Sequence, residues 1–148
     1  MTTLEFKIKL FNELSVHELY EVLKLRSEVF VVEQNCVYLD TDGKDEKALH
    51  LLGFINDKLV AYARVFGPGL YFDNASIGRV VIHPKYRMYG YGNDLLREAI
   101  QAIKKINAGA ITISAQEYLE KFYQEHGFKT VSVPYLEDGI PHIEMLLE

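Results

Sequence analysis

Cysteine is scarce in this sequence, and long apolar runs are missing. The single cysteine, Cys36, permits no disulfide within the chain and no cysteine-based metal site, as expected in a reducing compartment. No run approaches the ~20 apolar residues of a membrane-spanning helix. The N-terminus, MTTLEFKIK, lacks the apolar stretch of a signal peptide. We therefore expect a cytoplasmic protein with no membrane partner.

An excess of basic residues is also missing. Lys and Arg number 16 against 21 Asp and Glu, which gives a formal net charge of −5. This balance provides no general attraction to nucleic acid, so a polyanionic ligand would need a local basic pocket. Hydrophobic residues at 49% and charged residues at 25% exclude intrinsic disorder. The length predicts one domain over residues 1–148.

Hydrophobic periodicity predicts a mixed α/β protein with helices packed on a sheet. A capping box at Ser15 and Glu18 predicts a helix from Val16 to Val32 or Glu33, and the aperiodic segment that follows, to Lys47, is expected to be a loop. Further helices are expected from 90–93 to 107–109 and over 117–126, the last capped by Gly127. Strands are expected over 6–10, 49–55, 59–66, 75–82, from 111, over 128–135 and over 142–147.

The most informative motif is Arg87-Met88-Tyr89-Gly90-Tyr91-Gly92, between an apolar strand and a helix. The glycines allow the backbone to approach a ligand closely, and N–H groups at a helix start attract an anion. Lys85 and Arg87 add positive charge beside this loop. An ordinary strand-to-helix turn is the alternative. A dinucleotide fingerprint would need a glycine at Leu95, and a P-loop would need Gly-Lys followed by Ser or Thr, so both are excluded.

These residues resemble the GNAT acetyltransferases. Arg-x-x-Gly-x-Gly after Val80-Val81-Ile82 is similar to the coenzyme A motif of that family, and residues 122–128 (FYQEHGF) resemble the motif that follows it. Residues 29–36, 40–43 and 137–142 further resemble the ElaA-like branch. The resemblance implies a mostly antiparallel central sheet with a splayed parallel strand pair, flanked by helices. It also implies direct transfer of an acetyl group from acetyl-coenzyme A to an amine.

The resemblance further implies how the donor binds. The strand 77–82 should splay from the strand 110–115, and the pantetheine arm should hydrogen-bond the strand backbone at Val80 and Ile82. Met88 and Tyr89 stand where the family often has small and basic residues, which predicts weaker coenzyme A binding. The implied donor-binding residues are Val80, Val81, Ile82, Arg87, Met88, Tyr89, Gly90, Tyr91, Gly92, Asn93, Gln116 and Tyr123.

Three side chains are candidates for proton transfer. Tyr123 matches the family's general acid, since a phenol with a reference pKa of ~10 stays protonated at neutral pH and can protonate a departing thiolate. A tyrosine that only packs in the core is the alternative. For the general base there are two candidates, His142 and Glu33, acting directly or through water. For His142 the alternative is a strand-end histidine that is hydrogen-bonded to the backbone. For Glu33 it is a helix-end carboxylate that lies in solvent or orients the substrate.

Other patterns fail on spacing. The segment 17–21 (HELYE) has Glu where a zinc-binding helix needs its second His. A calcium loop starting at Asp40 would need Gly at 45 and Glu at 51, where Asp45 and Leu51 stand. Cys36 has no histidine partner fixed by sequence. We therefore expect no metal site.

The acceptor is left open by the sequence. The first helix, the segment 33–47 and the segment 136–141 should border it, and their acidic residues favour a cationic amine. A non-catalytic acyl-coenzyme A sensor and an acyltransferase with another acyl donor are the alternatives. The protein is expected to be a monomer or a homodimer, and the aromatic pair Tyr71-Phe72 would suit a dimer contact.

Overall fold

The structure is a computed structural model that describes residues 2–107 and 109–148. The helices are α1 (Val16–Arg26), α2 (Tyr91–Ile106) and α3 (Glu120–Gln124). Shorter helical segments are η1 (Phe11–Glu13), η2 (Ser27–Glu33), η3 (Asp45–Lys47), η4 (Pro84–Tyr86) and η5 (Glu117–Leu119). The strands are β1 (Glu5–Leu10), β2 (Leu49–Ile55), β3 (Lys58–Phe66), β4 (Ala75–Ile82), β5 (Ile111–Gln116), β6 (Lys129–Thr130), β7 (Tyr135–Glu137) and β8 (Ile140–Leu147).

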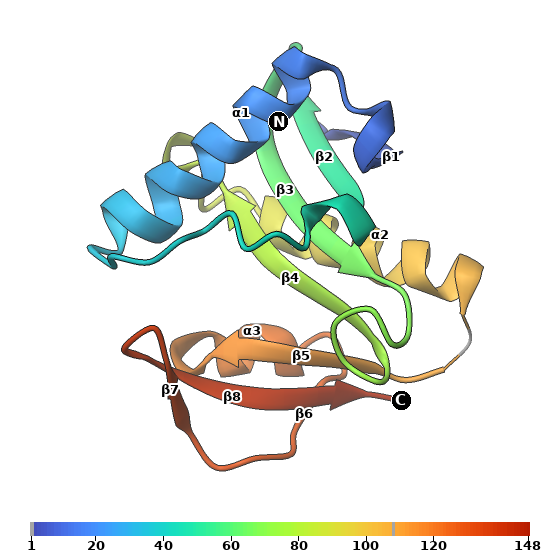
Figure 1. Cartoon of the computed structure of the whole chain (residues 1–148), viewed down its shortest axis with the longest axis vertical. Helices are drawn as coiled ribbons and strands as arrows, with labels where there is room; N and C mark the ends of the chain where they lie inside the picture. The colour runs from blue at the N-terminus through green and yellow to red at the C-terminus, as the bar shows by residue number, and fades with distance from the viewer. Residues whose placement is uncertain (1, 108) are drawn as a thin grey trace.

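The strands form one eight-stranded sheet in the order β1-β2-β3-β4-β5-β8-β6, and β7 pairs with β8. The pair β4–β5 is parallel, whereas the other pairs are antiparallel. The two parallel strands are paired only at Ala75 with Ile111 and at Ser76 with Thr112. Beyond these residues they diverge, as Figure 1 shows. The expected mixed sheet with a splayed parallel pair is confirmed.

The helices cover both faces of the sheet (Figure 1). On one face α1 buries Val22 and Leu25 against Leu52 and Tyr62. The apolar stripe of α2 faces the other side, in one core with residues of β3, β5 and β8, and Tyr123 of α3 joins that core. A buried Leu or Ile contributes ~1.5 to 3 kcal/mol, so these two stripes fix both helices to the sheet. The α2 residues in this core are Leu95, Leu96, Ala99 and Ile103.

The first helix confirms its predicted start and changes its winding near its end. Ser15 Oγ accepts a hydrogen bond from Glu18 N at 3.0 Å, and Glu18 Oε1 accepts one from Ser15 N at 2.9 Å. The last seven residues, Ser27–Glu33, wind as a π-helix, the wider turn that often occurs at functional sites. The Gln34 N–H closes this turn on Val29 O at 3.1 Å. The wider turn ends beside the cleft described below.

Two predicted elements are wrong in extent. The expected strand 128–135 is broken into β6 and β7, because Pro134 lacks an N–H and Ser132 Oγ takes the N–H of Glu144 at 2.9 Å in place of a backbone carbonyl. The expected helix 117–126 is split into η5 and α3. The predicted stop at 107–109 includes Ala108, which lies outside the described residues.

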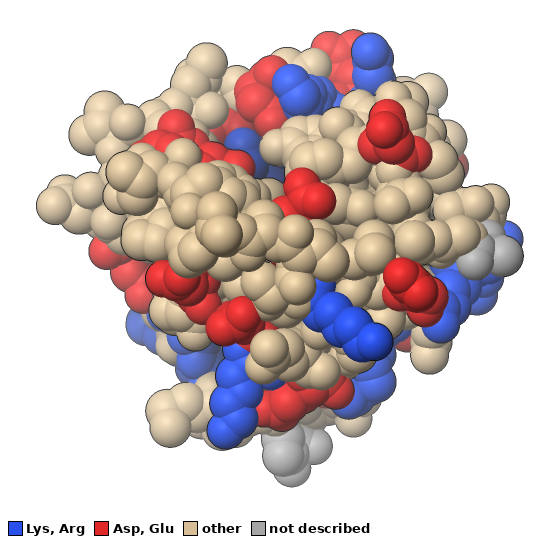
Figure 2. All heavy atoms as spheres, turned by 90° about the horizontal axis from the view of Figure 1, so that it is seen from below, with Lys and Arg blue, Asp and Glu red and all other residues tan. Residues whose placement is uncertain are grey.

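Charges of both signs are mixed on the surface. On the face seen in Figure 2, Lys and Arg side chains stand among Asp and Glu. Among the residues described, no helix combines the length and apolar character needed to cross a bilayer.

Candidate active site

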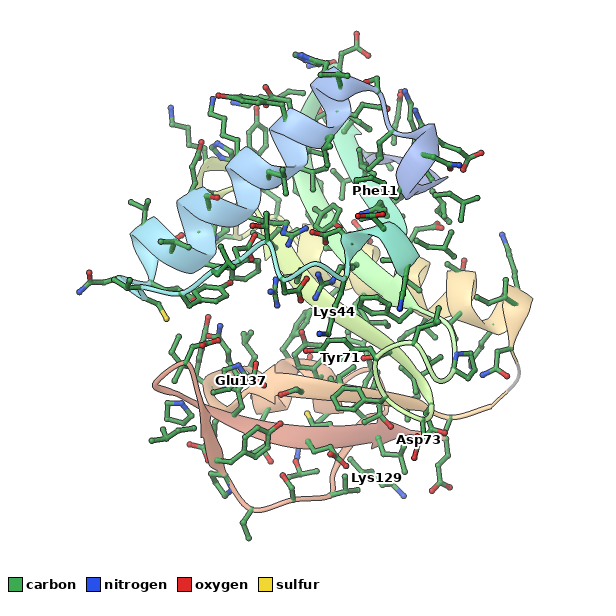
Figure 3. The ribbon with its side chains drawn as sticks, viewed as in Figure 1. Phe11, Lys44, Tyr71, Asp73, Lys129 and Glu137 are labelled. Atoms are coloured by element: carbon green, nitrogen blue, oxygen red, sulfur yellow. The ribbon has the colours of Figure 1, made fainter. Side chains whose placement is uncertain are left out.

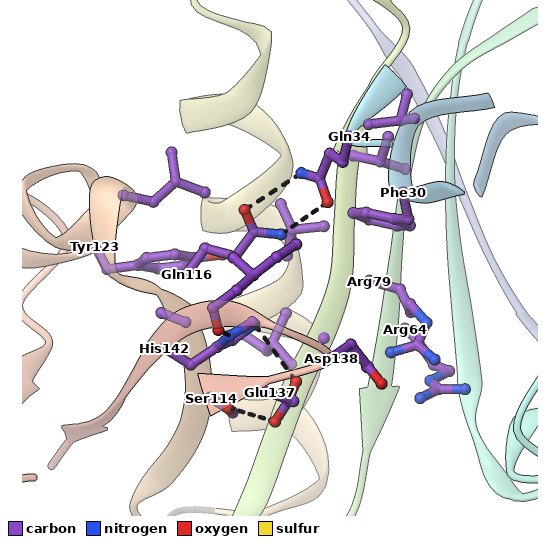
Figure 4. A pocket seen from close by; sticks show the side chains of 18 of the residues that line it. Phe30, Gln34, Arg64, Arg79, Ser114, Gln116, Tyr123, Glu137, Asp138 and His142 are labelled. Carbon is purple, nitrogen blue, oxygen red and sulfur yellow. Dashed lines mark hydrogen bonds and ion pairs between the residues drawn. The ribbon is translucent and has the colours of Figure 1, made fainter. Parts of the chain in front are cut away.

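A cleft of about 540 Å³ opens where β4 and β5 diverge. Residues 76–82 of β4 line it on one side, with the end of η2 and the segment after it. The opposite side consists of residues 114–116 of β5, the start of α3 and the β7–β8 hairpin (Figure 4). The cleft therefore collects residues from the first helix to the last strand, and Arg87 and Gly92 mark one of its ends.

The loop before α2 has the shape of an anion cradle. Gly90 is the N-cap of α2 with φ of 81°, in the left-handed region that glycine tolerates. Gly90 has no side chain that could cap the helix, and the Asn93 N–H donates to Gly90 O at 3.2 Å, so the N–H groups of Tyr91 and Gly92 are the ones open to a ligand. Met88 also has a positive φ of 69°, and both Met88 and Tyr89 are exposed. The predicted donor loop therefore presents backbone and no basic side chain at these two positions.

Arg87 is engaged in a contact that the sequence does not reveal. Its Nη1 and Nη2 donate to the two carboxylate oxygens of Glu33 at 2.6 and 2.8 Å, and its Nε donates to Ile82 O at 3.2 Å. The hydrogen bonds from Arg87 lower the pKa of Glu33. A carboxylate with a lowered pKa accepts a proton less readily, so this arrangement argues against the expected general-base role of Glu33.

The remaining donor-loop residues are placed by contacts within the fold. Tyr91 turns its side chain inward, where its hydroxyl donates to Thr2 O at 2.6 Å, so only its backbone faces the cradle. Asn93 Oδ1 lies 2.8 Å from His126 Nε2, which joins α2 to the turn after α3. A Cβ at Gly92 would lie 3.5 Å from Phe122. The two segments of the resemblance are therefore in direct contact.

The three β4 residues expected to bind the donor divide between the two faces of the strand. Val80 and Ile82 are partly buried against the core under α2, whereas Val81 is buried in the core under α1. All three border the cleft. Arg79, with φ of 50°, and a register shift toward β3 interrupt the strand just before them.

Tyr123 lines the cleft from α3. Its side chain is almost fully buried, and burial raises the pKa of its phenol. Among the described residues no hydrogen bond to this hydroxyl is found. The phenol is therefore protonated at neutral pH, with its proton uncommitted to a neighbour.

Gln116 forms a bridge across the cleft. Its side-chain amide and that of Gln34 exchange two hydrogen bonds, each 3.2 Å long, between the end of β5 and the end of η2 (Figure 4). The Cys36 thiol makes a second connection, donating to Asp138 O at 3.3 Å. Both contacts join the N-terminal half of the chain to the C-terminal half over the cleft.

His142 lies at the start of β8 and is 7% exposed. Its Nδ1 is 2.7 Å from Ile140 O. Because a carbonyl only accepts, Nδ1 carries the proton and Nε2 bears the lone pair in the neutral ring. Nε2 lies 3.4 Å from Glu137 Oε2 (Figure 4). The imidazole is thus held in one tautomer, with its basic nitrogen facing a carboxylate.

Glu137 lines the cleft and belongs to the segment 136–141 that was expected to border the acceptor, although it was not itself a candidate site residue. Its Oε1 accepts a hydrogen bond from Ser114 Oγ at 3.1 Å, and Ser114 Oγ lies 2.6 Å from the Tyr135 hydroxyl. The Tyr135 ring stacks on His142 with centroids 6.3 Å apart. The acidic character of the segment 136–141 was the available signal, whereas the partners of Glu137 on β5 and β8 could not be read from the sequence.

A buried ion network closes the other wall of the cleft. Arg26 donates to Asp40 at 2.8 Å and to Asp45 at 2.7 Å, although its side chain is fully buried. Arg64 binds Asp42 and Asp45, and Arg79 binds Asp40. Three acids of the segment 33–47 that was expected to face the acceptor, Asp40, Asp42 and Asp45, are therefore neutralised by arginines. Two features of the sequence could have revealed this ion network. Arg26 lies within the apolar stripe of the first helix, and Arg64 lies within an apolar strand.

No group of three or more His, Cys, Asp and Glu side chains in the described parts of the chain is arranged to hold a metal ion. Tyr71 and Phe72, expected at a dimer contact, line the cleft, and Tyr71 stacks on Phe66 with centroids 5.1 Å apart.

Comparison with known proteins agrees with this architecture. The family model of the acetyltransferase (GNAT) domain matches residues 17–148. A UPF0039 protein of Schizosaccharomyces pombe is 47% identical over 100% of this chain and 99% of its own. Protein ElaA of Escherichia coli is 42% identical over 93% of this chain and 92% of its own.

Solved structures give the same result. The crystal structure of Escherichia coli ElaA has a TM-score of 0.92 and 40% identity, covering 99% of this chain and 100% of that one. An acyl-CoA N-acyltransferase from Pseudomonas aeruginosa has a TM-score of 0.93 and 38% identity, with the same coverage. The chain therefore belongs to the GNAT acetyltransferase family, within its ElaA-like branch, and is an acyl-CoA-dependent acyltransferase.

Proposed function

We propose that this protein transfers the acetyl group of acetyl-coenzyme A directly to the nitrogen of an amine. One observation carries the proposal: the anion cradle before α2, the Tyr123 phenol and the His142 imidazole border the same cleft between the diverging strands. A donor held at the cradle and an acceptor entering from the β7–β8 side would meet there. No covalent intermediate on the protein is required.

The donor is assigned to the backbone of residues 87–92 and of β4. The first-turn N–H groups of α2 and the Arg87 guanidinium face the pyrophosphate, and the backbone at Val80 and Ile82 faces the pantetheine arm. Asn93 and Gln116 complete the donor end, Asn93 by holding the turn at His126 and Gln116 by bridging to Gln34. Glu33 has the role of a competitor for Arg87, because its carboxylate occupies the guanidinium that the donor needs.

The proposed reaction uses one base and one acid. His142 Nε2 takes a proton from the ammonium form of the acceptor, and the free amine attacks the thioester carbonyl. The new C–N bond forms, the C–S bond breaks, and Tyr123 gives its phenolic proton to the departing thiolate. The nitrogen loses a second proton, which restores Tyr123 by way of solvent, while His142 releases its own to solvent. A backbone N–H of β4 directed at the carbonyl oxygen would contribute ~3 to 4 kcal/mol to the barrier reduction.

The first experiment is thermal unfolding with acetyl-coenzyme A, coenzyme A, NAD and ATP, each added in turn. A ligand present at ~100-fold its Kd stabilises the native state by ~2.7 kcal/mol, which raises Tm by several degrees. We expect both coenzyme A species to raise Tm, and NAD and ATP to leave it unchanged. An equal shift with all four, or none with coenzyme A, would contradict the proposed cradle. Released thiol, measured with a panel of amines and several acyl donors, then separates an acetyltransferase from a sensor or from an enzyme with another donor.

Tyr123→Phe tests the assigned acid. The change removes only the phenolic oxygen, so kcat should fall ~100-fold or more while the Kd for coenzyme A stays the same. Tyr20→Phe, at an exposed position of α1, is the matched control and should behave as wild type. An unchanged kcat in Tyr123→Phe would remove the assignment.

A further inference from the structure

The positive and negative side-chain charges that line the cleft do not balance at its acceptor end. At the donor end Arg87 is paired with Glu33. Three arginines of the wall, Arg26, Arg64 and Arg79, form ion pairs with three carboxylates. The carboxylates are those of Asp40, Asp42 and Asp45. The two remaining acids, Glu137 and Asp138, have no Lys or Arg partner among the described residues. Within the described part of the chain, the only ion-pair contact of Glu137 is with the His142 imidazole, and with that ring neutral the acceptor end carries unbalanced negative charge, all of it on the β7–β8 hairpin.

Glu137 and His142 form a pair of acceptors that lacks a donor. The lone-pair nitrogen Nε2 of His142 and Oε2 of Glu137 lie 3.4 Å apart, and no described residue donates a hydrogen bond to this nitrogen. His142 is nine-tenths buried and lines the cleft. Ser114 Oγ donates to the other oxygen of Glu137, and the Tyr135 hydroxyl contacts Ser114 Oγ in turn. A cation with several N–H groups, such as an alkylammonium, satisfies both acceptors at once.

The rest of this end is apolar and largely aromatic. Phe30, Phe66, Tyr71 and Ile140 border it. Tyr71 and Glu137 come from the two sides of the cleft, the β3–β4 loop and the β7–β8 hairpin, as Figure 3 shows. The exposed Lys44 lies with its Nζ 6.0 Å from the centre of the Tyr71 ring and is not among the lining residues. Such walls bury an apolar body.

We infer that Glu137 and His142 together hold the ammonium group of an acceptor amine with an apolar body and no carboxylate, and that Glu137 determines this specificity. The inference rests on the proposed function for the role of the bound amine, but it concerns binding, so it can be tested without turnover. Glu137 also keeps His142 directed at the ammonium whose proton the imidazole removes. An amino acid is disfavoured, because its carboxylate would enter a cleft in which the positive charges of the arginines are already balanced by carboxylates of the chain.

The test measures binding of three matched probes to the coenzyme A-saturated protein by calorimetry. The probes are 2-phenylethylamine, the uncharged 2-phenylethanol, and phenylalanine, which adds a carboxylate to the same skeleton. We expect the amine to bind at least ~10-fold more tightly than either analogue, since hydrogen bonds to charged groups are the strong ones. Glu137→Gln should weaken amine binding to the level of the alcohol, leave alcohol binding and the coenzyme A Kd unchanged, and retain the wild-type Tm.

Glu5→Gln is the matched control, because Glu5 is an exposed glutamate on the edge strand β1. It should leave all three affinities unchanged. Equal binding of the three probes, no measurable binding of the amine, or an unchanged amine affinity in Glu137→Gln would overturn the inference. Thiol release is measured in parallel. If the amine binds through Glu137 and no thiol is released, the transfer reaction is wrong while the inference stands. If Glu137→Gln acetylates amines as well as the wild type does, the transfer reaction stands and the inference about Glu137 is wrong.

Discussion

The two ends of the cleft are built in different ways. The proposed donor end is centred on one continuous loop, residues 87–92, which presents its backbone and the N-terminus of α2. The acceptor end is assembled from η2, the β3–β4 loop, β5 and the β7–β8 hairpin, and an ion network behind it is almost completely buried. The donor end therefore depends on local backbone conformation, whereas the acceptor end depends on side chains distant in the sequence.

The difference has an energetic counterpart. The ion pair at the donor end, Glu33 with Arg87, is well hydrated, with side chains 42% and 38% exposed. Exposed pairs contribute at most ~1 kcal/mol and can be exchanged for a ligand at low cost. The pairs behind the acceptor end are buried, so loss of one partner leaves an uncompensated charge in the protein interior. We infer that the donor end is adaptable and the acceptor end is rigid.

Arg26→Met should produce the largest effect. It removes the guanidinium that binds Asp40 and Asp45 and leaves both carboxylates short of a partner in a buried position. The free energy of unfolding should fall by ~3 to 5 kcal/mol, as measured by urea denaturation. Arg97→Met is the control, because the Arg97–Asp94 pair is exposed, and its loss should stay below ~1 kcal/mol. A loss of similar size in both variants would mean that burial of the network does not matter.

Acid should weaken the acceptor side through the same network. Burial would raise the pKa of Asp42, but hydrogen bonds from Arg64 and from a backbone N–H outweigh it and hold that pKa below its usual range. The pKa of Asp45 is lowered in the same way. A carboxylate with a lowered folded-state pKa stabilises the fold above its unfolded value of ~3.9, and this contribution is lost as pH falls through the folded value.

His50 adds an earlier step to this acid profile. Burial lowers the pKa of His50, so protonation opposes folding once the pH drops below its unfolded value of ~6.5. Urea denaturation between pH 8 and pH 3 should show stability declining below ~6.5 and more steeply below ~4. A flat profile across this range would show that the buried carboxylates are not stabilised by the arginines.

Glu33→Gln should give the smallest effect, at the donor end. The change frees Arg87 and removes a negative charge that repels the donor phosphates. The Kd for coenzyme A should therefore fall by up to ~fivefold, the size expected for an exposed pair. Calorimetric titration measures the change, and Glu5→Gln serves as the control. Weaker binding in Glu33→Gln would mean that Glu33 positions Arg87 for the donor instead of competing for it.

Much of the fold follows from local sequence pattern. The Ser15–Glu18 capping box, the apolar runs of β2 to β4 and the stripe of α2 each predicted an element that the structure confirms. The failures occur where backbone groups find unexpected partners. Ser132 takes a ladder hydrogen bond between β6 and β7, and the end of the first helix widens into a π-turn. Neither change alters the apolar periodicity, so neither can be read from it.

The same distinction applies to the site. Residues 87–92 and Tyr123 could be proposed from the sequence because their motifs are short and continuous. The acids of residues 40–45 were assigned to the acceptor, because the sequence does not show that Arg26, Arg64 and Arg79 neutralise them. The acidic segment 136–141 was expected to border the acceptor, but the sequence did not single out Glu137, since its neighbours Ser114 and His142 are brought to it by sheet register.

The sequence by itself determined the element order and the family and pointed to the proposed donor loop, because helix caps, apolar periodicity and glycine backbone freedom act over a few residues. Only the tertiary structure decided which charged side chains form ion pairs inside the protein and which have no Lys or Arg partner in its described part and are proposed to bind the acceptor. Ion pairs and hydrogen bonds depend on distances of a few ångströms between segments far apart in the chain, and those distances are set when the sheet and helices pack together. For this reason the pairing of Arg87 with Glu33 and the open pair of Glu137 and His142 became visible only in the folded chain.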